Sequence, residues 1–169
     1  MFEKVRDRKA IDKMVEASLD ELVRFAYYRV GNRADAEDIV HEAILRLFER
    51  VARELTPDKL RGYLFRIVYN LCQDHFRHRN IPSVSFEAIN LPDLSDDVLD
   101  NEEVDRVNGL LDALPPRELE IVCMNVVDNL SFVEISQILS IPQSTAKSRF
   151  TSGMEKLRKQ YFTKKSLQP

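Results

Sequence analysis

The chain has 169 residues, 44% of them hydrophobic and 31% charged, with a formal net charge of -3. This composition is typical of a folded protein and excludes a largely disordered one. The acidic balance argues against a simple free-standing DNA-binding protein. Only four Gly and seven Pro occur, and long stretches rich in Leu, Glu, Arg, Ala and Ile favour helices.

The sequence carries no recognisable membrane signal. No apolar run approaches the roughly 18 residues needed to cross a bilayer, and the segment from Met1 to Arg8 is too charged for a signal peptide. We therefore expect a cytoplasmic protein with no direct membrane insertion. Cys72 and Cys123 lie in apolar helical patterns, so we expect buried thiols and no disulfide.

Charge is distributed unevenly along the chain. Every charged residue from Ile81 to Asp105 is acidic, whereas nearly all of those from Gln143 to Lys165 are basic. The acidic stretch is also rich in Pro, Ser and Asp and lacks a helical period over most of its length, which is typical of a linker. We predict an all-α protein of two small helical domains, residues 1–80 and 105–169, joined by an acidic linker at 81–104.

Three helices are predicted in the first domain. Gly31 follows the first helix as a stop, and Asn32 is placed to cap the second. Thr56 and Pro57 begin the third, as N-cap and first helical residue. The predicted apolar stripes are Leu19, Leu22, Val23, Ala26, Tyr27 and Val30 in the first helix, Ala36, Ile39, Val40, Ala43, Leu47, Phe48 and Val51 in the second, and Leu60, Leu64, Ile67 and Leu71 in the third.

The second domain has the pattern of a helix-turn-helix. A helix follows Pro115-Pro116; then Ser131 and Glu134 form a capping box that opens a short helix. After a tight break, a basic helix begins near Gln143, and two helices joined this closely match the motif. The inward residues are Leu119, Val122, Cys123, Val126, Val127 and Leu130 in the helix after the prolines, and Ala146, Phe150, Met154, Leu157 and Tyr161 in the basic helix.

The basic helix presents short polar side chains beside long cations. With Ala146 and Phe150 turned inward, short residues let a helix lie deep in a DNA major groove, while Lys and Arg reach phosphates or guanine edges. A solvated helix face is the alternative, and the pattern alone leaves both open. The outward residues are Gln143, Ser144, Lys147, Ser148, Thr151 and Ser152, with Arg149 to one side.

Residues 114–162 resemble region 4 of the extracytoplasmic-function (ECF) sigma factors, a group of the sigma-70 family. The segments that carry the resemblance are L-P-P-R-E at 114–118, L-S-F-V-E-I-S-Q-I-L at 130–139 and T-A-K-S-R-F at 145–150. Ser140 and Ser144 stand where the family usually has Gly. The resemblance implies that the promoter's -35 element is contacted by Ser144, Thr145, Lys147, Ser148 and Arg149.

The third predicted helix carries aromatic, basic and amide side chains on one flank. Tyr63, Arg66, Asn70, Gln73 and Arg77 share this flank at about 100° per residue. Such a mixture suits DNA that is being opened, although an ordinary half-exposed helix explains the composition at least as well.

The resemblance extends to this third helix. Residues 63–77 are similar to regions 2.3 and 2.4 of the same family, W-L-x-R-I-A-x-N-x-x-x-D-x-x-R, with Tyr63 in place of Trp. In the family, the loop before this helix takes part in capturing a flipped base, which places that loop near residues 51–59. The resemblance implies that the -10 element is contacted by Tyr63, Arg66, Asn70, Gln73, Asp74 and Arg77.

The second predicted helix begins with D-A-E-D-I-V-H-E-A at residues 35–43. Taken alone, this is an ordinary capped amphipathic helix. It also resembles region 2.2 of the family, which docks on the clamp coiled coil of the polymerase β′ subunit. The resemblance implies docking contacts by Asp38, His41, Glu42 and Arg46, with His41 where Gln is usual.

Two other classes of protein remain as alternatives. A conventional helix-turn-helix regulator would leave the polar flank of the third helix unexplained. A small helical enzyme or metal protein lacks a nucleophile–base pair, and Cys72, His75 and His78 are spaced so that they cannot converge on one ion without distortion. We expect no catalytic residue, no cofactor and no metal. The partners that the resemblance implies are promoter DNA, the RNA polymerase core through the β′ clamp and the β flap, and an anti-sigma factor.

Overall fold

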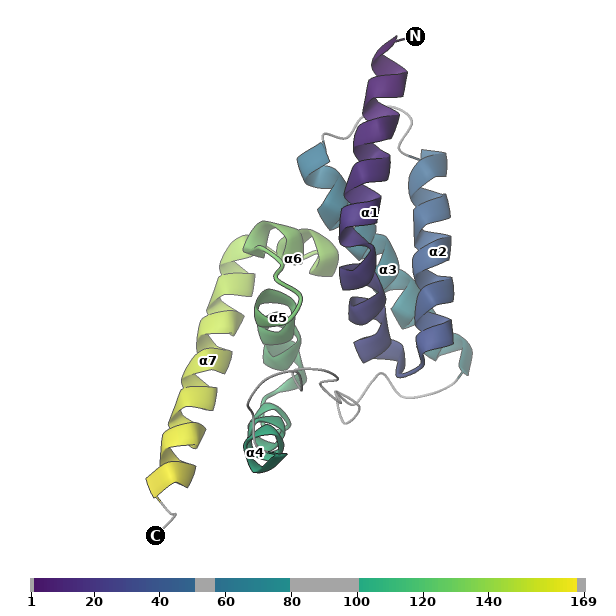
Figure 1. Cartoon of the computed structure of the whole chain (residues 1–169). Coiled ribbons are helices and arrows are strands. Elements are labelled where there is room, and N and C mark those ends of the chain that lie inside the picture. The colour runs from purple at the N-terminus through teal and green to yellow at the C-terminus, as the bar shows by residue number, and fades with distance from the viewer. Residues whose placement is uncertain (1, 51–56, 80–100, 167–169) are drawn as a thin grey trace. The chain divides into compact units, whose positions relative to one another are not determined.

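The protein is all-α. We describe residues 2–50, 57–79 and 101–166 of a computed structural model of the chain, and every regular element within those ranges is a helix (Figure 1). The predicted fold class is therefore confirmed. None of the described helices is both long enough and apolar enough to cross a membrane. The helices are α1 (Phe2–Val30), α2 (Arg33–Arg50), α3 (Pro57–Arg79), α4 (Asn101–Leu111), α5 (Pro116–Val126), α6 (Phe132–Leu139) and α7 (Gln143–Ser166).

The chain divides into two compact units. One is built on α1, α2 and α3, each of which packs against the other two, and the other is built on α7 with α4 and α5 against it. The predicted linker at 81–104 lies outside the described residues as far as residue 100. Its last four residues form the first turn of α4.

The first unit is a three-helix bundle whose core lies between α1 and α3. Phe25 and Phe65 are both 0% exposed and meet edge to face, with ring centroids 5.1 Å apart. Edge-to-face aromatic pairs add to the stabilisation that burial itself provides. An ion pair between Arg61 and Glu21, with a nitrogen–oxygen distance of 2.7 Å, joins the same two helices at the rim of the core.

The helix boundaries in this unit follow the predicted capping residues. Gly31 has a φ of 71°, and its N–H donates to the carbonyl of Tyr27, which closes α1. The side-chain oxygen of Asn32 accepts from the N–H of Asp35 at 3.1 Å, so Asn32 caps α2. Pro57 is the first residue of α3, as predicted; its predicted cap, residue 56, lies outside the described residues.

Three of the described residues assigned to apolar stripes are exposed; Val51, which was also assigned, lies outside the described residues. Leu19 is 41% exposed, Phe48 is 37% exposed and Val126 is 60% exposed. The prediction was wrong at these positions because each lies at the edge or the end of its stripe, and helical spacing does not define how wide the covered face is. In α1 the buried side of the helix is the one that contains Phe25 and Arg29. The α2 stripe is confirmed at Ala36, Ile39, Val40, Ala43 and Leu47.

Arg29 is a buried charge that the sequence pattern did not predict. Its side chain is 5% exposed, and the guanidinium carbon lies 3.5 Å from the centroid of the Phe25 ring. A guanidinium nitrogen donates to the Phe25 carbonyl at 2.8 Å. A cation–π contact and a hydrogen bond together offset part of the cost of burying the charge.

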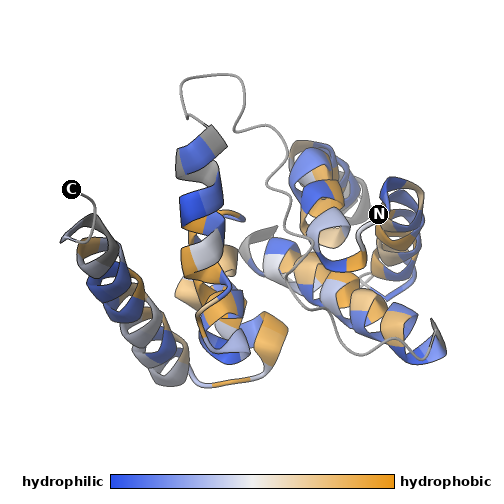
Figure 2. Ribbon diagram, turned by 90° about the horizontal axis from the view of Figure 1, so that it is seen from below, coloured by the Kyte–Doolittle hydropathy of each residue, from blue (hydrophilic) through white to orange (hydrophobic). Residues whose placement is uncertain are grey.

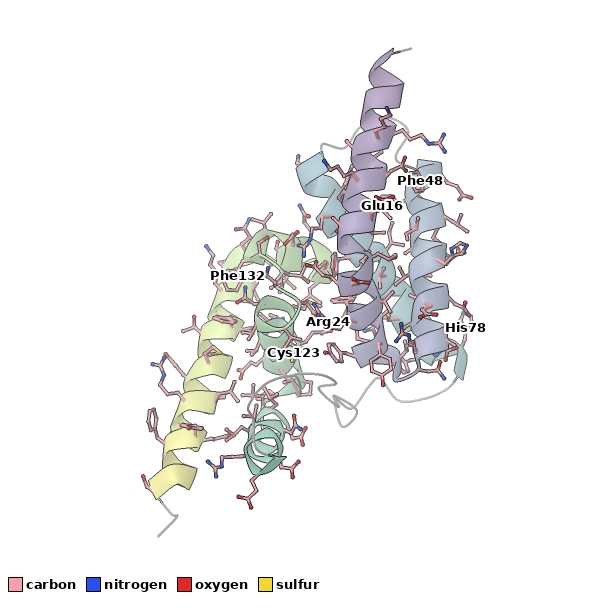
Figure 3. The ribbon with its side chains drawn as sticks, in the orientation of Figure 1. Glu16, Arg24, Phe48, His78, Cys123 and Phe132 are labelled. Atoms are coloured by element: carbon pink, nitrogen blue, oxygen red, sulfur yellow. The ribbon has the colours of Figure 1, made fainter. Side chains whose placement is uncertain are left out.

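Cys72, His75 and His78 occupy three different environments on α3. Cys72 is 0% exposed, and burial raises the pKa of its thiol to about 12 while Arg29 acts in the opposite direction. The Nε2 atom of His75 lies 3.5 Å from a carboxylate oxygen of Asp35, a contact between α3 and α2. His78, labelled in Figure 3, is exposed near the end of α3.

In the second unit, α5 is buried on most of its surface. It begins with Pro116 at the first helical position after Pro115 as N-cap, where the sequence pattern placed the start of a helix at the two prolines. A helix that is apolar around most of its circumference belongs in an interior, and in Figure 2 the helices of this unit show apolar residues on covered faces and polar residues elsewhere. The buried residues of α5 are Leu119, Ile121, Val122, Cys123 and Met124.

Candidate nucleic-acid and polymerase interface

The turn between α6 and α7 has the geometry of a helix-turn-helix. Ser140 follows α6 with a φ of 54°, in the left-handed region that L-residues rarely adopt. The N–H of Ile141 donates to the carbonyl of Ser136 at 3.1 Å, and the Ser136 hydroxyl donates to the carbonyl of Ile141 at 2.7 Å. This pair of hydrogen bonds closes the end of α6 in the manner of a Schellman motif, with serine in the usual glycine position.

The start of α6 is fixed by the predicted capping box. The Ser131 hydroxyl accepts from the N–H of Glu134 at 3.2 Å, while a carboxylate oxygen of Glu134 accepts from the N–H of Ser131 at 2.8 Å. The ring of Phe132, labelled in Figure 3, meets that of Phe150 at 5.3 Å and joins α6 to α7. α6 is therefore joined to α7 at both of its ends, by the Phe132–Phe150 contact at its start and by the turn at Ser140 at its end.

The polar face predicted for -35 contacts lies on the first two turns of α7. Ala146 is 0% exposed and anchors this end of the helix. Ser144, Lys147 and Ser148 are exposed around it, so they are available to a ligand on the outer side of the helix. Thr145 and Arg149 are half-buried at the edges of this face. All five predicted residues thus belong to one helix end, with short side chains outward and Lys147 and Arg149 as the cations.

The residues predicted for -10 contacts lie along one side of α3. Arg66, Asn70 and Arg77 are exposed, away from the buried face that contains Phe65, Val68 and Cys72. A carboxylate oxygen of Asp74 lies 3.5 Å from Arg77 on the solvent side. The remaining predicted residues, Tyr63 and Gln73, are half-buried.

Lys59 belongs to the same face, although it was not among the predicted residues. It lies in the first turn of α3, is exposed, and falls one helical turn before Tyr63. The helical period that aligns Tyr63 with Arg66 also aligns Lys59, so the signal was present in the sequence. The predicted base-capturing loop at 51–59 lies outside the described residues up to residue 56.

The predicted docking residues form an exposed band on α2. Asp38, His41, Glu42 and Arg46 are all exposed, and Arg46 donates to Glu42 at 2.7 Å on the helix surface. Such an exposed pair one turn apart contributes only about 0.3–0.5 kcal/mol to stability, so the band is not needed to hold the fold together.

Two large apolar side chains lie within this band. Leu45 is 47% exposed and Phe48, labelled in Figure 3, is 37% exposed. They follow His41 at intervals of four and seven residues, which puts them on the same side of the helix. Exposed apolar residues beside charged ones are typical of a protein-binding surface. We call these six residues, Asp38, His41, Glu42, Leu45, Arg46 and Phe48, the α2 surface.

Two family models match the chain in the order of its two units. Sigma-70 region 2 matches residues 14–80, which contain α2 and α3, and Sigma-70, region 4 matches residues 110–159, which contain α5, α6 and most of α7. Together they define the class: a two-part protein of the sigma-70 type, with the helix-turn-helix in its second part.

Similar proteins of known role narrow the class further. The chain is 29% identical to "ECF RNA polymerase sigma factor SigE" of Mycolicibacterium smegmatis, over 98% of this chain and 68% of that protein. It is 28% identical to "ECF RNA polymerase sigma factor SigW" of Bacillus subtilis, over 91% of this chain and 90% of that one. The fold is also that of the sigma factor RpoE of Bartonella quintana, solved with the anti-sigma factor NepR, with a TM-score of 0.64 and 20% identity over 88% and 94% of the two chains.

The chain belongs to the extracytoplasmic-function sigma factors of the sigma-70 family. It is an RNA polymerase sigma factor and not a conventional helix-turn-helix regulator, as the sequence resemblance predicted.

Proposed function

We propose that this sigma factor holds promoter DNA at two places while it is attached to the polymerase. α7 reads the -35 element, α3 engages the -10 element as it opens, and the α2 surface docks on the clamp coiled coil of the β′ subunit. The observation that carries this proposal is the exposed polar end of α7. It combines the helix-turn-helix geometry with residue types that match the family's -35 segment.

The α7 face fits duplex DNA. A helix enters the major groove only where its outer side chains are small enough, and Ser144 and Ser148 meet that requirement. Lys147 supplies a charge for phosphate, and Arg149 reaches phosphate or a guanine edge. The residues that we assign to the -35 element are Ser144, Thr145, Lys147, Ser148 and Arg149.

The α3 face fits DNA whose bases are no longer paired. Arg66 and Arg77 provide charge for the backbone, Asn70 offers an amide to a base edge, and the half-buried ring of Tyr63 offers a stacking surface. Lys59 extends the positive charge by one helical turn. The residues that we assign to the -10 element are Lys59, Tyr63, Arg66, Asn70, Gln73, Asp74 and Arg77.

The α2 surface fits a protein partner better than it fits DNA. Asp38 and Glu42 would repel phosphate, whereas Leu45 and Phe48 offer apolar area to bury. We therefore assign Asp38, His41, Glu42 and Arg46, as predicted, and add Leu45 and Phe48. The chemistry of transcription is performed by the polymerase, and the sigma factor contributes binding and orientation.

We also propose the division into a region 2 domain at 1–80, an acidic linker at 81–104 and a region 4 domain at 105–169. The linker sets the separation of the two DNA-binding faces along the promoter and contacts the polymerase near its RNA exit path. The β flap is the second contact with the polymerase. A protein that acts on the chromosome through the polymerase works in the cytoplasm.

An anti-sigma factor is a further proposed partner. The structures that are similar in fold carry titles that name such complexes: RpoE with the anti-sigma factor NepR, and CnrH with the cytosolic domain of CnrY, the latter with a TM-score of 0.61 and 20% identity. A partner that covered Leu45 and Phe48 would keep the factor from the polymerase.

The -35 assignment is tested by Arg149→Ala. Loss of one cationic contact to a base edge or phosphate costs about 1–3 kcal/mol of binding free energy, or roughly 5- to 150-fold in affinity. The measurement is initiation by core polymerase with the full chain, on a promoter recovered by in-vitro transcription of a genomic library.

Arg117→Ala is the matched control, because Arg117 is an exposed arginine in the first turn of α5, in the same unit. Initiation should fall with Arg149→Ala and not with Arg117→Ala. Unchanged initiation by the Arg149 variant on a promoter that depends on its -35 element would remove Arg149 from the assignment.

A further inference from the structure

α5 and α7 approach each other closely at Gly153. Gly153 is buried, and a Cβ atom placed on it would lie 2.9 Å from Cγ2 of Val122 and 3.4 Å from Cβ of Glu118. The first distance is shorter than packed carbon atoms tolerate. Glycine destabilises a helix interior relative to alanine, so its presence in the middle of α7 needs a packing reason. The close contact with α5 supplies one.

A polar cluster closes this contact. Both carboxylate oxygens of Glu118 accept from the ammonium group of Lys156, at 2.8 and 2.9 Å. The hydroxyl of Ser152 donates to one of the same oxygens at 2.9 Å. The Glu118 side chain is only 14% exposed, and the Lys156 hydrogen bond is the main reason that its pKa is lowered. Ser152 precedes Gly153 and Lys156 follows it, so one carboxylate of α5 binds α7 on both sides of the glycine.

These residues follow the proposed DNA contacts along α7. Gly153 and Lys156 come four and seven residues after the half-buried Arg149, on the same side of the helix, whereas Lys147 lies on another side. Lys147 and Ser148 are exposed, whereas Gly153 is buried against α5. Gly153 follows Ser148 by five residues, or about 7.5 Å along the helix axis. A change in the depth or rotation of α7 at Gly153 therefore moves Ser148 relative to the rest of the unit, and contacts that discriminate bases are sensitive to small displacements.

We propose that Glu118, Ser152, Gly153 and Lys156 are positioning residues for -35 recognition: they set how deeply and at what rotation α7 sits on α5. We call them the α5–α7 clasp. Lys156 acts through Glu118 and does not contact DNA, although it lies in the basic helix. This inference rests on the proposed -35 role of α7.

The steric part of the clasp is tested with Gly153→Ala in the full chain bound to core polymerase. The methyl group of the new alanine would lie too close to Val122, so α7 must shift to make room for it. We therefore expect affinity for the library-derived promoter to fall about tenfold. On the same promoter fragment with its -35 element scrambled, Gly153→Ala should leave the affinity equal to that of the parent chain. Adding Val122→Ala removes Cγ2 and should restore most of the lost affinity.

The matched control is Gly109→Ala, because Gly109 is exposed near the end of α4. It also replaces a helical glycine by alanine, but at an exposed position and away from Val122, and it should leave promoter affinity unchanged. Unchanged -35 binding by Gly153→Ala, or no recovery in the Val122 double variant, would overturn the steric part.

The polar part is tested by comparing Lys156→Gln with Lys147→Gln over a series of salt concentrations. A lysine that contacts phosphate contributes about one unit to the slope of log affinity against log salt. Lys147→Gln should reduce the slope by about one. Lys156→Gln and Glu118→Gln should each lower affinity about three- to tenfold at an unchanged slope, and the double variant should lose no more than the worse single variant.

A reduced slope for Lys156→Gln would show that Lys156 contacts DNA and would refute its assigned role. Arg149→Ala distinguishes a failure of the α5–α7 clasp from a failure of the proposed -35 role of α7. If Arg149→Ala weakens -35 binding and Gly153→Ala does not, only the clasp is wrong. If neither has an effect, the -35 assignment falls as well.

Discussion

Ser140 shows how one residue shapes the helix-turn-helix. Its φ of 54° is costly for a residue with a Cβ atom, and the hydrogen bonds between Ser136 and Ile141 hold it there. Asn129, with a φ of 52°, has the same conformation after α5, but asparagine tolerates it better. The tight turn was predicted from the sequence, and its left-handed residue is serine.

We predict that Ser140→Gly stabilises the turn between α6 and α7 by about 0.5–1 kcal/mol, because relief of left-handed strain exceeds the extra entropy that glycine loses on folding. Hydrogen exchange of the α6 and α7 amides measures the effect. Asn129→Gly is the control and should gain less. Faster hydrogen exchange of these amides in Ser140→Gly than in the parent chain would contradict the claim that Ser140 is strained.

Cys72 predicts a pH dependence of stability in the first unit. Burial raises the pKa of its thiol in the folded chain from 9.0 to about 12, so the folded state holds the proton more tightly than the unfolded state. The stabilisation is complete below pH 9 and is lost as the pH rises from 9 toward 12, at up to about 1.4 kcal/mol per pH unit.

The measurement is urea unfolding of the parent chain and of Cys72→Ala at pH 8, 9 and 10. Alanine lacks the titrating group, so the difference in unfolding free energy between the two should shrink as the pH rises. A difference that stays constant over this range would show that the Cys72 thiol does not titrate as described.

At the scale of the helices, local signals predicted more than periodicity did. Asn32, Pro57 and the Ser131–Glu134 capping box placed helix starts correctly, because each satisfies backbone groups within one turn of itself. The spacing of apolar residues predicted which side of each helix is buried, but it did not predict how wide the buried face is. Phe48, at the edge of the α2 stripe, was therefore wrongly assigned to the core.

Two features of the helices could not be predicted because they depend on neighbours distant in sequence. Arg29 stacks on Phe25 of its own helix, but it is close enough to Cys72 of α3 to lower that thiol's pKa, so its burial involves α3, although arginine is normally exposed. Gly153 is explained only by Val122 and Glu118 of α5. A single sequence shows a glycine in a helix but does not show what approaches it.

The α2 surface gives a prediction at this scale. Glu42→Lys reverses a charge in the middle of the surface and leaves the buried stripe of α2 untouched, so helix content should not change. We expect affinity for core polymerase to fall roughly tenfold or more, since like charges across an interface are repulsive. Competition for core polymerase with a labelled parent chain measures it.

Glu16→Lys is the matched control, because Glu16 is an exposed glutamate on α1, labelled in Figure 3, outside the α2 surface. Glu16→Lys should bind core polymerase as the parent chain does. Normal binding by Glu42→Lys would remove Glu42 from the docking contacts.

For the whole molecule, the distribution of charge matters more than the total. The net charge of -3 disfavours DNA binding by the chain alone, while two helix faces carry the cations and polar groups that DNA requires. The all-α class and the family were predictable, because ordered motifs extend over most of the chain. The residues that contact DNA and polymerase remain predictions, since they depend on partners that the chain by itself does not include.

The central claim is that the chain recognises promoters through RNA polymerase, and one measurement tests it most directly. Purified chain is added to core polymerase with a genomic promoter library, and initiation is compared with duplex binding by the chain alone. The account predicts initiation from a defined set of promoters with core polymerase, and weak, unspecific duplex binding without it. Tight, sequence-specific binding to duplex DNA by the chain alone, without promoter-specific initiation, would contradict the account.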